Sequence, residues 1–169
     1  PARCAEALGQ DRRVLDVAEQ DRDGPCRRCV CMQVRALGLQ GGDDIVEPAY
    51  PAPPTSEFVT SGPKSVVPFD TIGKEGRRFV LMALAADEIS AVMNEPAIDP
   101  IRIVGGYEAA DGTEERARLC LAELESLGAF DRSLICIASP TGVGYVSYTF
   151  AESLEYLTRG DCAIVIPQY

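Results

Sequence analysis

The stretch SPTGVGY, residues 139–145, is the part of this chain whose residue types are best suited to bind an anion. Gly142 and Gly144 lack side chains, so their backbone N–H groups can approach an anion or a developing oxyanion closely. The hydroxyl-bearing residues of the same loop are Ser139, Thr141 and Tyr145. The alternative is a tight turn, in which the glycines only provide backbone angles that other residues disfavour. The loop is neither a Walker loop nor a complete dinucleotide fingerprint.

Two further polar residues stand where neighbouring strands are predicted to end. Glu108 follows the strand that begins at Ile101, and Gln168 follows the last strand. Glu108, together with Asp111, has the chemistry to position a base or a hydroxyl group. The alternative is a solvated acidic loop that leads into a helix cap. Residues 105–108, 139–145 and 167–169 are called the carboxyl rim below, because ligands of parallel α/β sheets bind beyond the carboxyl ends of the strands.

The chain contains no histidine among its 169 residues. A Ser-His-Asp or Cys-His catalytic device therefore cannot be assembled from these residues alone. A zinc site that uses imidazole is excluded for the same reason. No G-x-S-x-G elbow occurs either, so no serine has a local nucleophile signature.

Seven cysteines divide into two groups. The stretch CRRCVC places Cys26, Cys29 and Cys31 at a spacing that suits zinc or an iron–sulfur centre, with Cys4 as a fourth ligand. The alternative is an incidentally cysteine-rich segment, and we predict no cofactor. The other three lie in apolar patterns, where free cysteine behaves as a small hydrophobic residue: Cys120, Cys136 and Cys162.

The elements that must position the rim follow from hydrophobic periodicity. β-branched or apolar runs predict three strands at residues 101–104, 134–138 and 163–166. Between them, a helix is predicted over residues 113–127, and a second over residues 149–160. Predicted caps are Asp111 with Glu114, Thr149 with Glu152, and the terminating glycines Gly128 and Gly160. The strand–helix order predicts an α/β fold of the Rossmann-like three-layer type, with adjacent parallel strands and helices on both faces.

The first 100 residues have weaker patterns. We predict a charged, cysteine-containing segment over residues 1–47, a proline-rich linker over 48–60 and the α/β domain over 61–169. Within the first 100 residues, we expect a helix over residues 29–37, a strand over 76–83 and a short helix over 87–93 that ends before Pro96.

Composition limits the function classes. The formal net charge of −10 argues against a general nucleic-acid or anionic-membrane binder, which needs a clustered basic surface. With 46% apolar residues, the chain can bury one real core. No apolar run approaches the ~20 residues of a membrane span, and no signal-peptide pattern opens the chain. From the proline at position 1 and the abrupt end we expect a fragment or a processed chain.

Several pieces of the chain resemble, in the same order, the actinobacterial alpha/beta-hydrolase family of predicted membrane proteins, also called a domain of unknown function. They include SGPKSVVPFDTIGKEGRRFV, ADEISAV, GAFDRS, SPTGVGYV and EYLTRGD. The resemblance covers residues 55–169 or so and implies the N-terminal half of a serine-hydrolase-like domain. It further implies a longer parent protein that has an N-terminal membrane region. In that parent protein, the nucleophile serine, the acid and the histidine would lie beyond Tyr169. Only the loop Ser139–Tyr145 carries over, as an oxyanion-side or substrate-side element.

We therefore predict that the parent is a serine esterase or lipase-like acyl hydrolase and that these residues alone are inactive. The alternative is a non-catalytic α/β module that binds a small anion or a protein partner. The edge beside residues 162–167 is expected to be covered by a second copy, a partner chain or a rearranged strand, because bare hydrophobic edges aggregate. Location is left open apart from the membrane-associated parent that the resemblance implies.

Overall fold

The computed structural model describes residues 28–33, 50–141 and 144–168, and of residues 28–33 only the backbone. The elements, in chain order, are β1 (Arg28–Gln33), η1 (Phe69–Thr71), α3 (Gly73–Leu81), α4 (Ala86–Met93), β2 (Ile101–Gly105), α5 (Gly112–Ser126), η2 (Ala129–Asp131), β3 (Leu134–Ser139), α6 (Tyr148–Thr158) and β4 (Cys162–Pro167).

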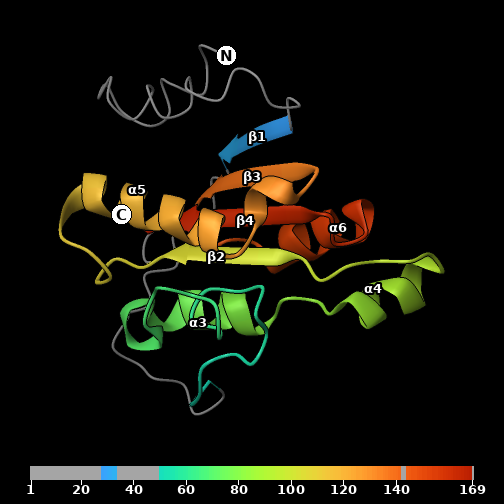
Figure 1. Cartoon of the computed structure of the whole chain (residues 1–169), viewed down its shortest axis with the longest axis horizontal. Coiled ribbons are helices and arrows are strands. Elements are labelled where there is room, and N and C mark those ends of the chain that lie inside the picture. The colour runs from blue at the N-terminus through green and yellow to red at the C-terminus, as the bar shows by residue number, and fades with distance from the viewer. Residues whose placement is uncertain (1–27, 34–49, 142–143, 169) are drawn as a thin grey trace.

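The strands form one parallel sheet in the order β1-β3-β4-β2 (Figure 1). The prediction that the strands at 101–104, 134–138 and 163–166 lie side by side is confirmed, with β4 between the other two. In the register, Ala163 of β4 lies opposite both Ile135 of β3 and Ile101 of β2. All residues of β2 are buried, as expected for a strand covered on both faces.

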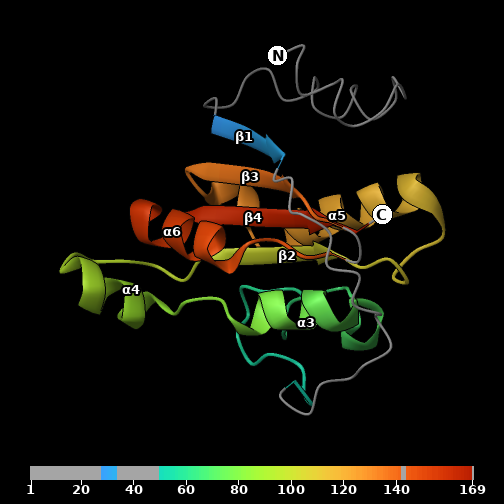
Figure 2. The same ribbon diagram turned by 180° about the vertical axis from the view of Figure 1, so that it is seen from behind.

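Helices cover both faces of the sheet, which confirms the predicted three-layer α/β fold. The connection from β2 to β3 passes beyond the position of β4, and the connection from β3 to β4 returns in the opposite direction. Because such crossovers are right-handed, opposite directions place α5 and α6 on opposite faces. In Figures 1 and 2, α5 lies in front of the sheet in one view and behind it in the other.

Two apolar clusters separate along the same division. One joins α3 and α6 to the sheet, with Phe79, Ala151 and Ile164 among its buried members. The other joins α5 to the opposite face, with Cys120, Ile103 and Val165 among its members. Each fully buried Ile or Phe side chain contributes about 1.5–3 kcal/mol before conformational entropy is subtracted, so these clusters fix the layers.

Two predicted elements are wrong in type. Residues 76–83 were expected to form a strand, but most of them belong to α3, whose buried residues Gly76, Phe79 and Val80 are spaced i, i+3, i+4. The helix expected over residues 29–37 is β1 over Arg28–Gln33, paired with β3, and residues 34–37 lie outside the described residues. A short apolar run satisfies both periods, and its tertiary partners decide between them.

The later helices match their predicted positions, whereas two predicted caps do not form. Asp111 is the N-cap residue of α5 but makes no side-chain cap hydrogen bond. Thr149 lies inside α6, and Ser147 holds the N-cap position instead. The glycine stops are confirmed, since Gly128 and Gly160 have φ values of 71° and 76°.

The prediction that residues 162–167 form an exposed edge is wrong, because β4 pairs with β3 on one side and β2 on the other. The predicted covering partner loses that support and stays an untested prediction. Beside β2, the buried Val59 forms an isolated parallel bridge to Arg102, with flanking backbone hydrogen bonds. The predicted linker therefore supplies residues to the core next to β2.

Candidate functional site

The carboxyl rim lies where β2, β3 and β4 end, at Gly105, Ser139 and Pro167. The chain leaves β2 toward α5 on one face and leaves β3 toward α6 on the other. The space beyond β4, which lies between them, is thus the point where the connections diverge. Ligands of open α/β sheets bind at such points.

The glycine loop closes on itself through backbone hydrogen bonds. The Thr141 N–H donates to the Tyr145 carbonyl at 3.0 Å, and the N–H groups of Gly144 and Tyr145 donate to the Thr141 carbonyl at 3.4 and 3.3 Å. Gly142 lies outside the described residues. The described N–H groups of residues 141–145 are therefore engaged within the turn, which is the geometry of the tight-turn interpretation. Ser139 is the half-buried last residue of β3.

Gln168 joins three segments of the rim. Its side-chain amide donates to the Ile72 carbonyl at 3.1 Å and accepts the Tyr107 N–H at 2.8 Å, while its backbone N–H donates to Gly105. A Cβ atom on Gly144, which has φ 108°, would lie 2.2 Å from Gln168 Nε2. Gln168 is buried and holds the start of α3 against the ends of β2 and β4.

The acidic rim candidate Glu108 is exposed. Within the described part of the chain it has no hydrogen-bond or ion-pair partner. This placement fits the solvated-loop alternative, in which the side chain serves solubility.

A second group of side chains, absent from the sequence-based candidates, lies beside the glycine loop. Tyr148, the first residue of α6, donates its hydroxyl to Glu75 Oε2 of α3 at 2.6 Å. The Arg78 guanidinium lies over the Tyr148 ring at 4.3 Å, and the Tyr145 ring meets the Tyr148 ring edge-on at 5.5 Å. Burial, followed by the Glu75 hydrogen bond, raises the pKa of Tyr148, so its hydroxyl stays protonated. We call Glu75, Arg78, Tyr145 and Tyr148 the tyrosine cluster.

The position of the two helices that carry this cluster depends on a buried ion pair. Arg102 of β2 donates to Glu155 of α6 through Nε at 2.6 Å and Nη2 at 2.8 Å, and through Nη1 to the Phe79 carbonyl of α3 at 2.8 Å. Both charged side chains are fully buried. Burial raises the pKa of Glu155, whereas the hydrogen bonds from Arg102 and the Leu84 N–H oppose that rise. One arginine thus ties α3 and α6 to the sheet.

The sequence holds a signal for this ion pair, although no partner for Arg102 was predicted from it. Arg102 interrupts the apolar run IRIV, and a charge in a strand buried on both faces requires a partner. The tyrosine cluster had a weaker signal. Glu75 and Arg78 share a helix face at i, i+3, but this spacing has no meaning in the strand that was expected there.

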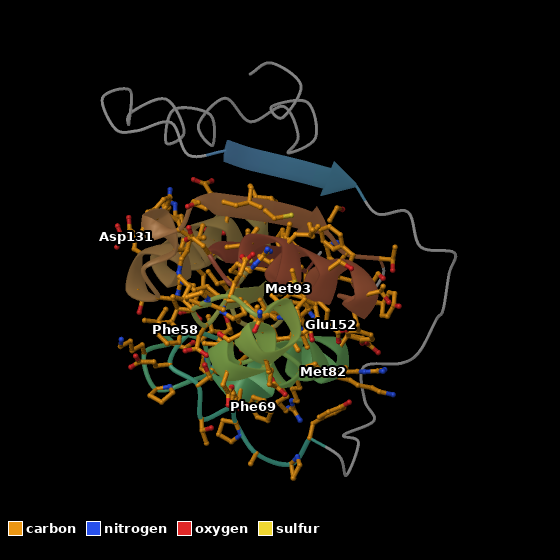
Figure 3. All side chains as sticks on the ribbon, turned by 90° about the vertical axis from the view of Figure 1, so that its right-hand side faces the viewer. Phe58, Phe69, Met82, Met93, Asp131 and Glu152 are labelled. Carbon is orange, nitrogen blue, oxygen red and sulfur yellow. The ribbon has the colours of Figure 1, made fainter. Side chains whose placement is uncertain are left out.

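The opposite end of the molecule holds an open groove of ≈ 560 Å³. It is lined mainly by apolar atoms, with Phe58, Ile98 and Leu127 beside the polar Asp131 and Arg132. Figure 3, which views the molecule from this end, labels Phe58 and Asp131 on the same side. The lining residues precede β2 and β3, so the groove lies away from the rim.

Among the described residues, no group of three or more His, Cys, Asp and Glu side chains is placed to hold a metal ion. Cys4 and Cys26 lie outside the described residues, and the side chains of Cys29 and Cys31 in β1 are not described, so neither interpretation of the CRRCVC stretch is tested. The three core cysteines are buried, which confirms their structural role. Burial raises the pKa of the Cys120 and Cys162 thiols to about 11, which keeps them protonated and unreactive at neutral pH.

Residues 101–169 match the model of a family described as the alpha/beta-hydrolase family. The matched part runs from β2 to the end of the chain and includes the rim loops. No curated protein and no solved structure matches the chain. In the part of the chain that the structure describes, no helix has both the length and the apolar character of a membrane span. The fold is α/β and is consistent with a partial α/β-hydrolase-like domain.

Proposed function

We propose that these residues form part of a serine-type acyl hydrolase, an esterase or lipase-like enzyme, whose nucleophile and histidine are supplied by residues other than these 169. The observation that carries the proposal is the match of residues 101–169 to the alpha/beta-hydrolase family. That stretch contains three of the four strands in the described part of the chain, and the rim where substrates of parallel α/β enzymes bind. The resemblance of residues 55–100 points to the same family.

The lack of histidine supports the second half of the proposal. Acyl transfer by serine needs a base that takes the hydroxyl proton and returns it to the leaving group, and imidazole does this in serine hydrolases. The serine–carboxylate contacts among the described residues involve no residue of the carboxyl rim. Ser65 donates to Glu123 at 2.5 Å, and Glu123 also accepts the Val66 N–H, so this buried carboxylate organises a turn.

The test is ester hydrolysis by the purified 169-residue chain. We expect no hydrolysis of p-nitrophenyl acetate or butyrate above the buffer rate, and no covalent labelling by a fluorophosphonate probe. A longer protein that contains these residues together with a serine elbow and a histidine should hydrolyse the esters and be labelled at one serine.

Two outcomes would overturn the proposal. Turnover by the 169-residue chain that disappears on substitution of a single serine would show that a different device operates here. Ser65→Ala and Ser133→Ala are the first substitutions to compare, since both hydroxyls contact carboxylates. A longer protein with neither turnover nor labelling would remove the hydrolase assignment.

A further inference from the structure

The Arg78 guanidinium differs from those of the other described arginines because no hydrogen bond or ion pair to a described residue engages it. Arg102, Arg118 and Arg159 form ion pairs with carboxylates, and Arg77 donates to the Phe69 carbonyl. Arg116 and Arg132 donate to backbone carbonyls. Arg78 lies over an aromatic ring, as several of the other arginines do, and its buried Nε, like that of Arg116, has no hydrogen-bond partner among the described residues. Within 4 Å, no described carboxylate pairs with its guanidinium.

The nearest carboxylate does not neutralise Arg78, because it is engaged elsewhere. Glu75 accepts the Tyr148 hydroxyl at 2.6 Å, at the edge of the ring, whereas Arg78 lies over the face of the ring at 4.3 Å. The ring thus holds the two charged groups at different positions. The edge-on contact from Tyr145 fixes the ring from another side.

Stacking prepares a guanidinium to bind an anion. A free arginine side chain loses much rotamer entropy when it is ordered, but one already held on an aromatic ring has lost most of it. The planar group presents paired N–H donors that match the two oxygens of a carboxylate or phosphate. Arg78 therefore keeps a positive charge that no described carboxylate pairs with, in a chain whose net charge is −10.

The location agrees with ligand binding. Glu75 lies in the first turn of α3, which Gln168 holds against the rim through Ile72, and Tyr148 opens α6 directly after the glycine loop. The N-terminal ends of both helices therefore face the carboxyl rim, and Arg78 of α3 lies over the ring of Tyr148, the first residue of α6. Figure 2 shows the two helices on the same side of the sheet. Parallel α/β sheets bind ligands at this edge.

We infer that Arg78, stacked on Tyr148, is the anion-recognition residue of the rim and binds a carboxylate or phosphate group of the ligand. The described N–H groups of the glycine loop are engaged in their own turn, so the guanidinium takes the role that sequence analysis had considered for that loop. The inference rests on the proposed function in one respect. If the chain forms part of an acyl hydrolase, the anion belongs to the substrate, and esters that carry a negative charge are preferred.

Binding can be measured on the 169-residue chain without turnover. Phosphate and succinate, with neutral succinamide as the reference, are titrated at constant ionic strength while arginine Nε–H and backbone amide resonances are followed by NMR. The chain has no tryptophan, so tyrosine fluorescence provides a second readout. We expect saturable shifts at Arg78 with phosphate or succinate or both, and none with succinamide.

Three variants make the test specific. Arg78→Ala should weaken binding about tenfold or more, since it removes charge-assisted hydrogen bonds. Tyr148→Phe keeps the ring but removes the hydroxyl that engages Glu75, so the freed carboxylate can pair with Arg78 and anion binding should weaken. Arg118→Ala removes an exposed arginine of α5 and should leave binding unchanged.

Equal affinity of the Arg78→Ala variant and the unchanged chain, with both folded by circular dichroism, would overturn the inference. Absence of a saturable shift with both anions in the unchanged chain would do so as well. Comparing the two anions shows whether the site prefers a planar or a tetrahedral group. Because no ester is hydrolysed in these titrations, failure of the hydrolase proposal leaves their result standing, and the reverse also holds.

Discussion

Removing the charge of Glu155 should strongly destabilise the fold. The Glu155→Gln variant keeps the size of the side chain but leaves the Arg102 guanidinium buried without a counter-charge. Both side chains are fully buried, and the carboxylate accepts two hydrogen bonds, at 2.6 and 2.8 Å, from Arg102. The amide that replaces the carboxylate in this variant has a single oxygen, which can take over only one of these two acceptor positions.

Breaking a buried ion pair on one side costs about 3–5 kcal/mol, because an uncompensated charge stays in the interior. That is a large share of the about 5–15 kcal/mol that separates folded from unfolded domains. For a chain of this length, each kcal/mol corresponds to about 2–4 °C, so the melting temperature should fall by roughly 6–20 °C.

The assay is thermal and urea unfolding followed by far-ultraviolet circular dichroism. The matched control is Glu152→Gln, the same chemical change one turn earlier on α6 at a half-buried position (labelled in Figure 3), which should shift stability by less than about 0.5 kcal/mol. The double variant Arg102→Met with Glu155→Leu should recover most of the loss, since well-packed apolar replacements of buried ion pairs are often neutral or stabilising. If Glu155→Gln is no more destabilising than Glu152→Gln, the reasoning is refuted.

Three further predictions concern the rim and the core. Gln168→Ala should lower the free energy of unfolding by about 2 kcal/mol or more, because the Tyr107 N–H and the Ile72 carbonyl lose their partner; an unchanged urea midpoint would contradict this. Gly106→Ala should cost about 1–3 kcal/mol by melting, since the added Cβ would lie 2.2 Å from the backbone oxygen of Thr71; a melting temperature equal to that of the unchanged chain would count against it. Burial raises the thiol pKa of Cys162 from 9.0 to about 11, so the unfolded state releases its proton first and stability should fall as pH rises from 9 to 11, by up to about 3 kcal/mol for this thiol. In Cys162→Ala this part of the fall should be missing, and identical pH profiles would refute the assignment.

The second half of the chain was largely predictable from its sequence. The strands at 134–138 and 163–166 are continuous apolar runs, and the strand at 101–104 is apolar apart from Arg102. The α5 helix carries its apolar residues at helical spacing. These local signals agree with the tertiary structure, so each element and its parallel arrangement could be inferred. The order of the strands within the sheet could not, because β4 enters between two strands that precede it in the chain.

The first half was less predictable because its local signals are ambiguous. The run RRFVLMA is short and apolar, and β-branched and aromatic residues in such a run favour a strand. The run becomes helical because Phe79 and Val80 pack beside Val104 and Ile164 in one apolar cluster. β1 was not predicted because its pairing partner, β3, lies about a hundred residues later in the chain.

The misassigned element is also the reason the tyrosine cluster was not foreseen. Arg78 and Tyr148 are 70 positions apart and meet only if α3 is a helix, if α6 lies on the same face of the sheet, and if both helices start at the rim. Arg102 supports the second condition, because it donates both to the Phe79 carbonyl, one residue after Arg78, and to Glu155, seven residues after Tyr148. A variant that breaks the ion pair without unfolding the chain should therefore loosen the stack of Arg78 on Tyr148 and weaken anion binding together with stability. If stability falls while anion affinity stays constant, the stack is held by Glu75 and Tyr145 alone, and the ion pair serves only the core.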